Sequence, residues 1–158
     1  ATYCNIYAYD VCFLAGIFLP RVWWKADALR RLDQGEAVTP RYDVTIHELN
    51  ANALCDWLDD HGPRFGWRRT LDLGEVQDAA NAGRLVTICA QRVDLNRSGH
   101  ITIVAPEQGA ETAVRSGGKV VRPLQSQAGS RNFRYDTGGT AWWTHERFRK
   151  FGFWVNDR

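Results

Sequence analysis

The order of two hydrophobic periodicities constrains the fold of this chain more than any other feature. Apolar residues recur at helical spacing over residues 2–16 and 45–60. Residues 85–91, 100–105 and 148–155 are instead rich in β-forming residues, and apolar side chains alternate in the last of these runs. Helical patterns followed by strand patterns are typical of an α+β domain, in which helices pack on an antiparallel sheet.

Capping and stop residues give the limits of the expected helices. Thr2 is the expected N-cap of the first helix, and Gly16 is its expected stop. Thr45 and Glu48 match the S/T-x-x-E capping box, which predicts that a helix begins at Thr45. The expected helices cover residues 2–16, 26–32, 45–60 and 75–82.

The second half of the chain predicts an antiparallel meander. Its expected strands cover residues 85–91, 100–105, 119–127 and 148–155, with a polar loop at residues 106–118. Residues 94–99 begin like a calcium-binding loop, but Ala105 stands where such a loop needs a bidentate glutamate. We therefore expect a hairpin turn at residues 94–99 and no calcium site.

Length and charge exclude some classes of function. A chain of 158 residues is long enough for one domain, residues 1–158, with a hydrophobic core. A net charge of +2 is too small to predict a nucleic-acid partner, and no apolar run reaches the ~18 residues of a membrane span. Because the sequence has no Met, we expect a processed product or a domain of a longer protein.

Four cysteines are spaced widely and form no CxxC pair, so a zinc ribbon or thioredoxin motif is not expected. Cys12, Cys55 and Cys89 are interpreted as buried thiols. Cys4 falls in the first turn of the first helix, where free N–H groups and the helix dipole favour a thiolate. Cys4 is therefore a candidate nucleophile, and the alternative is a small buried apolar residue.

A base for this nucleophile is expected on the strands. His100 opens a strand directly after a turn, where it can take the thiol proton and later give it to a leaving amine. Gln125 or Gln127 can hold the imidazole ring through its amide oxygen, and strand alternation cannot choose between them because both share one face. Backbone N–H groups near Cys4, with Tyr3 as a helper, are the expected oxyanion site.

Residues 2–11, 99–104 and 127–133, with a further marker at 48–52, resemble the NlpC-type papain-like cysteine hydrolases of bacterial and phage cell-wall enzymes, close to the CHAP amidases. The resemblance implies a papain-like fold, with N-terminal helices on an antiparallel sheet. It implies Cys4 as nucleophile, His100 as base and Gln127 rather than Gln125 as the orienting residue. It also implies no metal and no cofactor. The family's frequent Asp-Cys-Ser-Gly start is replaced here by Tyr-Cys-Asn-Ile, and Gln stands where His, Asn or an acid is more frequent.

The expected function is hydrolysis of amide bonds in peptidoglycan, in the periplasm or at the cell wall. An antibacterial toxin of this kind would have an immunity protein as a partner. One alternative is a non-catalytic wall-binding module that stacks sugars on its tryptophans, and another is the same thiol chemistry on a different acyl substrate. The expected cleft residues are Tyr3, Asn5, Trp23, Trp24 and the loop at 35–45, and the expected sugar-stacking residues are Trp23, Trp24, Trp142 and Trp143.

Overall fold

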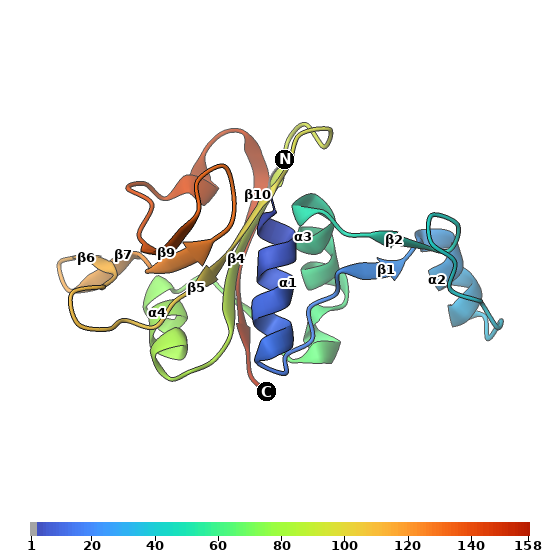
Figure 1. Ribbon diagram of the computed structural model, residues 1–158, viewed down its shortest axis with the longest axis horizontal. Helices are drawn as coiled ribbons and strands as arrows, with labels where there is room; N and C mark the ends of the chain where they lie inside the picture. Colours follow the sequence, from blue (N-terminus) through green and yellow to red (C-terminus); the bar gives the residue numbers. More distant parts are fainter. Residues whose placement is uncertain (1–2) are drawn as a thin grey trace.

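The computed structural model describes residues 3–158 and has an α+β architecture (Figure 1). The helices are α1 (Cys4–Leu14), α2 (Ala26–Asp33), α3 (Ala51–Asp60) and α4 (Leu73–Asn81), with short 3-10 turns η1 (Gly62–Phe65) and η2 (Trp142–Thr144). The strands are β1 (Val22–Trp24), β2 (Ile46–Glu48), β3 (Trp67–Thr70), β4 (Val86–Arg92), β5 (His100–Val104), β6 (Val114–Ser116), β7 (Lys119–Arg122), β8 (Gln125–Gln127), β9 (Phe133–Asp136) and β10 (Phe148–Asn156).

Six strands form the central sheet in the order β3-β10-β4-β5-β8-β9, and every neighbouring pair is antiparallel. The prediction of a simple meander is wrong, because β10 enters between β3 and β4. β10 pairs with β3 along one edge and with β4 along the other, and its residues 152–156 are buried in the sheet. β4 is buried along nearly its whole length, including the polar residues Thr87 and Gln91, because helices cover both faces of the sheet.

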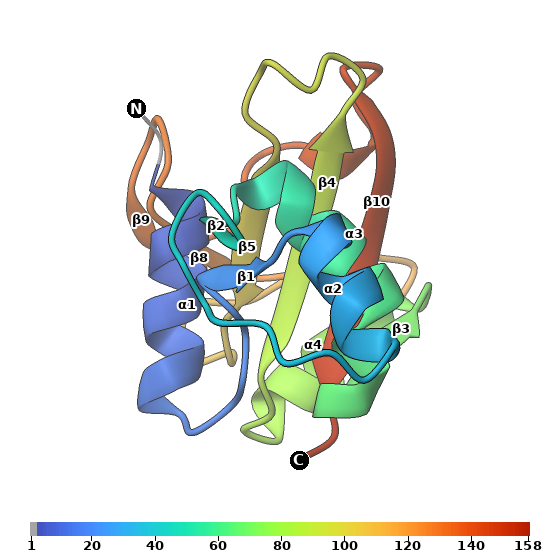
Figure 2. The same ribbon diagram turned by 90° about the vertical axis from the view of Figure 1, so that its right-hand side faces the viewer.

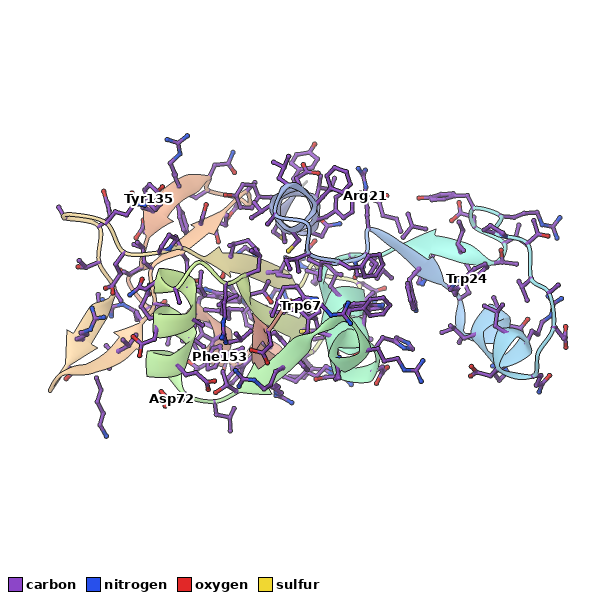
Figure 3. All side chains as sticks on the ribbon, turned by 90° about the horizontal axis from the view of Figure 1, so that it is seen from below. Arg21, Trp24, Trp67, Asp72, Tyr135 and Phe153 are labelled. Carbon is purple, nitrogen blue, oxygen red and sulfur yellow. The ribbon has the colours of Figure 1, made fainter. Side chains whose placement is uncertain are left out.

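Helices cover both faces of the sheet (Figures 1 and 2). Helices α1 and α3 pack on one face, where α1 contacts β5 and β8. Helix α4 packs on the other face against β4, β5 and β10. Trp67 belongs to the apolar cluster on the α1/α3 side, and Phe153 belongs to the cluster on the α4 side (Figure 3). Each face of the sheet therefore has its own hydrophobic core.

The helix expected to begin at Thr45 begins later, so that prediction is wrong. Ile46–Glu48 form β2, which pairs with β1, and Asn50 caps α3 by accepting a 3.0 Å hydrogen bond from the Ala53 N–H. The Thr45 hydroxyl instead accepts from the Arg41 N–H at 2.7 Å and holds the preceding loop. Asn50 is an equally good cap and stands directly before the buried residues of α3, so it replaces the capping box.

Residues 119–127 form two strands instead of the single predicted strand. β7 pairs with β6 in a separate ribbon, and β8 belongs to the central sheet. Pro123 separates the two strands, because it lacks the N–H that a continuous ladder needs. β6 lies within the segment predicted to be a loop.

Several local predictions are confirmed. Gly16 has a φ of 72° just past the end of α1, and α2 and α4 agree with prediction to within two residues. Cys12, Cys55 and Cys89 are buried and not in disulfides. Thr2 lies outside the described residues, and the N-cap position of α1 is occupied by Tyr3, whose side chain makes no capping hydrogen bond.

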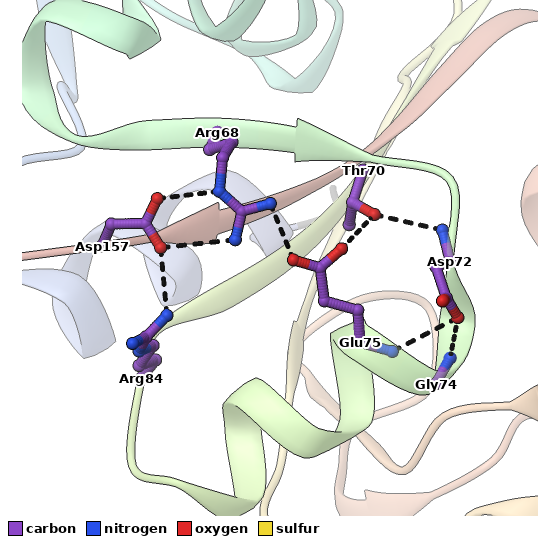
Figure 4. Close-up of polar contacts among 7 residues, drawn as sticks. All are labelled: Arg68, Thr70, Asp72, Gly74, Glu75, Arg84 and Asp157. Carbon is purple, nitrogen blue, oxygen red and sulfur yellow. Dashed lines mark hydrogen bonds and ion pairs between the residues drawn. The ribbon is translucent and has the colours of Figure 1, made fainter.

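A polar cluster at one end of the sheet ties α4 to the C-terminal residues (Figure 4). Asp72 caps α4 by accepting from the Gly74 and Glu75 N–H groups at 2.8 and 3.3 Å. Arg68 pairs with Glu75 at 2.7 Å and with Asp157 at 2.8 Å. These contacts link β3, the start of α4 and Asp157, and they do not involve the residues of the β4–β5 hairpin that positions His100.

No helix within residues 3–158 is both long and apolar enough to cross a membrane.

Candidate functional site

His100 is the first residue of β5, and a tightly closed hairpin fixes its position. The buried Asn52 side chain donates to the Arg97 carbonyl at 2.9 Å and accepts from the Arg92 N–H at 2.9 Å. A Cβ on Gly99 would lie 2.5 Å from Asn52 Oδ1 and 2.7 Å from the Ala90 carbonyl oxygen. Only glycine fits this close contact. The contact of Gly99 with Asn52 of α3 therefore fixes where His100, the next residue, begins β5.

Gln127 on β8 holds the His100 ring. Gln127 Oε1 lies 2.5 Å from His100 Nε2, and Gln127 Nε2 donates to the Arg131 carbonyl at 2.8 Å. The second bond fixes the amide orientation, so the oxygen faces the imidazole and can only accept. His100 therefore carries its proton on Nε2, and the lone pair on Nδ1 is free to accept a proton.

Gln125, the alternative orienting residue, has a different position. It is fully buried, and its Oε1 accepts from Thr102 Oγ1 and from Trp142 Nε1, both at 2.9 Å. The Trp142 ring lies edge-on to His100 with centroids 4.6 Å apart. Gln125 thus positions Trp142 against the His100 ring, and it makes no hydrogen bond to His100 itself.

Sequence reasoning did not identify Trp142 and Asn52 as residues that position His100. The sequence predicts Trp142 as a sugar-stacking residue and has Asn52 within a family marker, and neither pattern indicates a position beside His100. η2 packs against β4 and β10, and from there the Trp142 side chain reaches His100 and Gln125, which is a non-local arrangement.

Burial lowers the pKa of His100 below its ordinary value, and the positive charge of Arg147 lowers it further. The hydrogen bond to Gln127 acts in the opposite direction but is the smaller effect. His100 is therefore neutral at pH 7, which is the form that can accept a proton.

Cys4 lies in the first turn of α1, as expected, but its thiol is not ionised. The side chain is 2% exposed, and backbone N–H groups of Ile101, Asn5 and Cys4 itself face the sulfur. These N–H groups lower the pKa of Cys4, but burial raises it by more, so the net shift is upward. The N–H groups of the first turn favour the thiolate, as predicted, but desolvation outweighs them and leaves the pKa of Cys4 above its ordinary value.

Cys4 and His100 do not contact each other in the structure. Cys4 packs against Ile101, the residue that follows His100. Within the described part of the chain, no hydrogen bond joins the Cys4 thiol to His100, and none is made by His100 Nδ1. A thiol and a general base often come into register only when substrate is bound. The structure therefore brings His100 of β5 and Gln127 of β8 into contact. It places Cys4 against Ile101, whose side chain points to the opposite face of β5 from that of His100.

The other expected cleft residues are dispersed. Tyr3 is 58% exposed beside Cys4, and the Asn5 amide donates to the Leu49 carbonyl at 3.0 Å, which ties α1 to the segment before α3. Trp23 packs edge-on against Trp57 in an aromatic cluster on α3, with centroids 5.7 Å apart. Figure 3 places Trp24 on the β1–β2 side of the molecule, beyond α3, and the 35–45 loop joins α2 to β2 on that side.

A pocket of about 370 Å³ opens beside His100. Its lining combines the His100–Gln127 pair with aromatic and cationic side chains, and Cys4 is not part of it. The lining residues are Arg92, Ser98, Gly99, His100, Gln127, Ser130, Arg131, Phe133, Gly138, Trp142, Arg147 and Phe148. Such a cleft is large enough for one or two residues of a peptide.

Over residues 3–158, no three His, Cys, Asp or Glu side chains are grouped to hold a metal ion. In comparisons with known proteins, the chain matches no protein-family model and no curated protein. Function is therefore inferred from the geometry of the site together with the resemblance of the sequence motifs.

Proposed function

We propose that this protein is a cysteine hydrolase that cleaves amide bonds of cell-wall peptides, with a papain-like arrangement of its helices and sheet. The observation that supports this most is the fixed tautomer of His100. Gln127 occupies Nε2 at 2.5 Å, which leaves Nδ1 with a free lone pair in a site where the imidazole is neutral. The Gln127 amide is oriented in turn by the Arg131 carbonyl, so the hydrogen bond holds one tautomer of His100.

The reaction follows the usual thiol route. The Cys4 proton passes to His100 Nδ1 as the sulfur attacks the amide carbonyl, and the backbone N–H groups near Cys4 stabilise the oxyanion. His100 then gives that proton to the amine nitrogen as the C–N bond breaks, which leaves a thioester on Cys4. Water attacks the thioester, His100 takes its proton, and the acid and the free thiol are released.

In the structure, Cys4 is a neutral buried thiol, so His100 must create the nucleophile during the reaction. Rotation of the Cys4 side chain toward Nδ1 is the movement that this mechanism requires. The pKa of Cys4 is held up by burial, and substrate-induced contact with a base removes that obstacle by moving the proton directly.

The decisive experiment is digestion of purified peptidoglycan with the wild type, Cys4→Ala, His100→Ala and Cys12→Ala, followed by mass spectrometry of the soluble fragments. Cys12 is the matched control, because it lies on the same helix and burial raises its pKa to about 12. We expect new amine and carboxyl ends between stem residues with the wild type and Cys12→Ala, and none with the other two variants. Digestion that survives Cys4→Ala would disprove the mechanism.

One observation favours a second candidate, a non-catalytic wall-binding module. Cys4 is 2% exposed and is not bonded to His100. The four tryptophans expected to stack on sugars do not form one exposed surface. Trp143 is 3% exposed in the core, and Trp23 packs on α3. Sedimentation of the protein with intact walls, without release of fragments, is the result that would favour this candidate.

The same digestion experiment addresses the substrate class. If the wild type leaves peptidoglycan intact but a Cys4-dependent thioester is trapped with other acyl donors, the substrate is a different amide or ester. A periplasmic or cell-wall site of action is part of the proposal, and an immunity protein is the expected partner if the protein acts as a toxin.

A further inference from the structure

Within residues 3–158, two arginines that line the His100 pocket have no acidic partner. Arg92 ends β4, Arg147 precedes β10, and the Val93 N–H donates to the Arg147 carbonyl at 2.9 Å. Their guanidinium groups lie 5.5 and 4.9 Å from the ring centroid of Phe148. The shared aromatic ring therefore holds two positive charges at one edge of the pocket.

The third arginine that lines the pocket, Arg131, differs from Arg92 and Arg147 because it has an acidic partner. Arg131 pairs with Asp136 at 2.9 Å. Within residues 3–158, neither Arg92 nor Arg147 has a carboxylate within 4.0 Å. Asp94 is an acid whose charge acts on Arg92, and its carboxylate accepts from the Asn96 N–H at 3.0 Å inside the turn.

These two cations also repel each other. The pKa of Arg92 is lowered by burial and by the neighbouring charges of Arg147 and Arg97, with Asp94 offsetting part of this. Arg92 donates to the Ser98 carbonyl at 2.8 Å, which fixes the side chain and leaves terminal N–H groups free. A bound anion would relieve the repulsion, and guanidinium groups suit a carboxylate because they donate two parallel hydrogen bonds.

We propose that Arg92 and Arg147 bind a carboxylate group of the substrate beside the bond that is cleaved. The inference rests on the proposed function for its substrate, a cell-wall peptide, whose residues carry free carboxyl groups that some walls amidate. The carboxylate would lie on the Phe148 side of the pocket, with the scissile amide directed toward His100. This site therefore distinguishes acidic stem peptides from amidated ones.

The test measures binding separately from cleavage. Isothermal titration of the full chain carrying Cys4→Ala uses a synthetic stem tetrapeptide with free carboxyl groups and the same peptide with its carboxyl groups amidated. We expect the acidic peptide to bind about tenfold more tightly or better. Adding Arg92→Gln and Arg147→Gln should reduce that affinity to the level of the amide without changing amide binding. Arg149→Gln is the control, because Arg149 lies on β10 but does not line this pocket.

Hydrolysis of both peptides by the otherwise wild-type protein at pH 8, where His100 is neutral in every variant, separates the two proposals. A preference for the acidic peptide in binding, without hydrolysis of either, supports the carboxylate site and contradicts the proposed reaction. Equal binding and equal Cys4-dependent cleavage of both peptides overturns the carboxylate site and leaves the reaction standing. Binding of neither peptide, or a preference that survives the double substitution, also overturns the site.

Discussion

His100 Nε2 and Gln127 Oε1 are 2.5 Å apart, although 27 positions separate the residues in the sequence. Because Gln127 is itself held by the Arg131 carbonyl, the pair behaves as a fixed unit at the end of two strands. The pair defines which nitrogen of His100 is free to act. The effect of the His100–Gln127 hydrogen bond on the tautomer of His100 is therefore the property to test first.

Gln127→Ala should release the ring of His100 and let both neutral tautomers form. We expect a loss of about 100-fold in kcat on a cell-wall peptide, the usual effect of misplacing a catalytic group. Nitrogen chemical shifts of His100 should report a proton on Nε2 in the wild type and a mixture in the variant. Gln108→Ala is the control, since Gln108 is exposed on a loop. An unchanged tautomer in Gln127→Ala would contradict this interpretation.

The pKa of His100 should be measurably low. Burial and Arg147 lower it, so an NMR titration should give a midpoint below the ordinary value of ~6.5. The unfolded chain then takes up this proton before the folded protein does, so stability falls as the pH drops below ~6.5. Arg147→Gln should move the midpoint upward. A midpoint at or above ~6.5 in the wild type would contradict the proposed burial of the ring.

Trp142→Phe should keep the edge contact with His100 and remove one hydrogen bond to Gln125. Gln125 Oε1 still accepts from Thr102, so the expected cost is about 1 kcal/mol of unfolding free energy. Trp142→Ala should cost about 3 kcal/mol or more, because the ring itself is lost. Urea denaturation measures both, with Trp24→Phe as the control outside this contact. Equal stability of the two Trp142 variants would show that the ring does not pack as described.

Gly99→Ala should damage the hairpin that positions His100. The added methyl group would overlap Asn52 Oδ1 and the Ala90 carbonyl, and one of these is backbone that cannot move cheaply. We expect a loss of about 1–3 kcal/mol in stability together with reduced kcat. Ser98→Ala, in the same turn, should be nearly neutral. Combining Gly99→Ala with Asn52→Ala should not restore stability, because the backbone contact remains.

The sequence was sufficient for the features that depend on local pattern. The helix-then-strand order, the buried run of β4 and the stop at Gly16 all follow from neighbouring residues. The start of α3 was mispredicted because two caps, Thr45 and Asn50, lie five residues apart, and pairing of β2 with β1 decided between them.

Features that depend on long-range pairing were not predictable in the same way. Gln125 and Gln127 share a strand face, so only the register of β8 on β5, with Val104 opposite Gln125, separates their roles. The pKa of Cys4 likewise depends on how deeply α1 packs on the sheet, whereas its helix position alone indicated the opposite direction. Local residues place a group on an element, and the tertiary fold decides its environment.

Glu107 anchors the loop after β5 and provides a test of acid stability. Its carboxylate receives two hydrogen bonds from Arg115, at 2.6 and 2.9 Å, and one each from the Asn81 amide and the Ala113 N–H at 2.8 Å. These donors, with Arg115 foremost, lower the pKa of Glu107 to about 2. The folded pKa lies below the unfolded value of ~4.3, so the stabilisation is present above that pH and is lost as the pH falls toward 2.

Glu107→Gln should remove most of this dependence. At pH 7 we expect a loss on the order of 1 kcal/mol, since Arg115 is 38% exposed and water weakens the pair. The difference between the variant and the wild type should shrink as the pH is lowered from 5 toward 2, because protonation removes the same charge from the wild type. Urea midpoints at several pH values measure this. Glu111→Gln is the control, because Glu111 is an exposed glutamate in the same loop. A constant difference across that range would show that the Glu107 charge does not stabilise the loop.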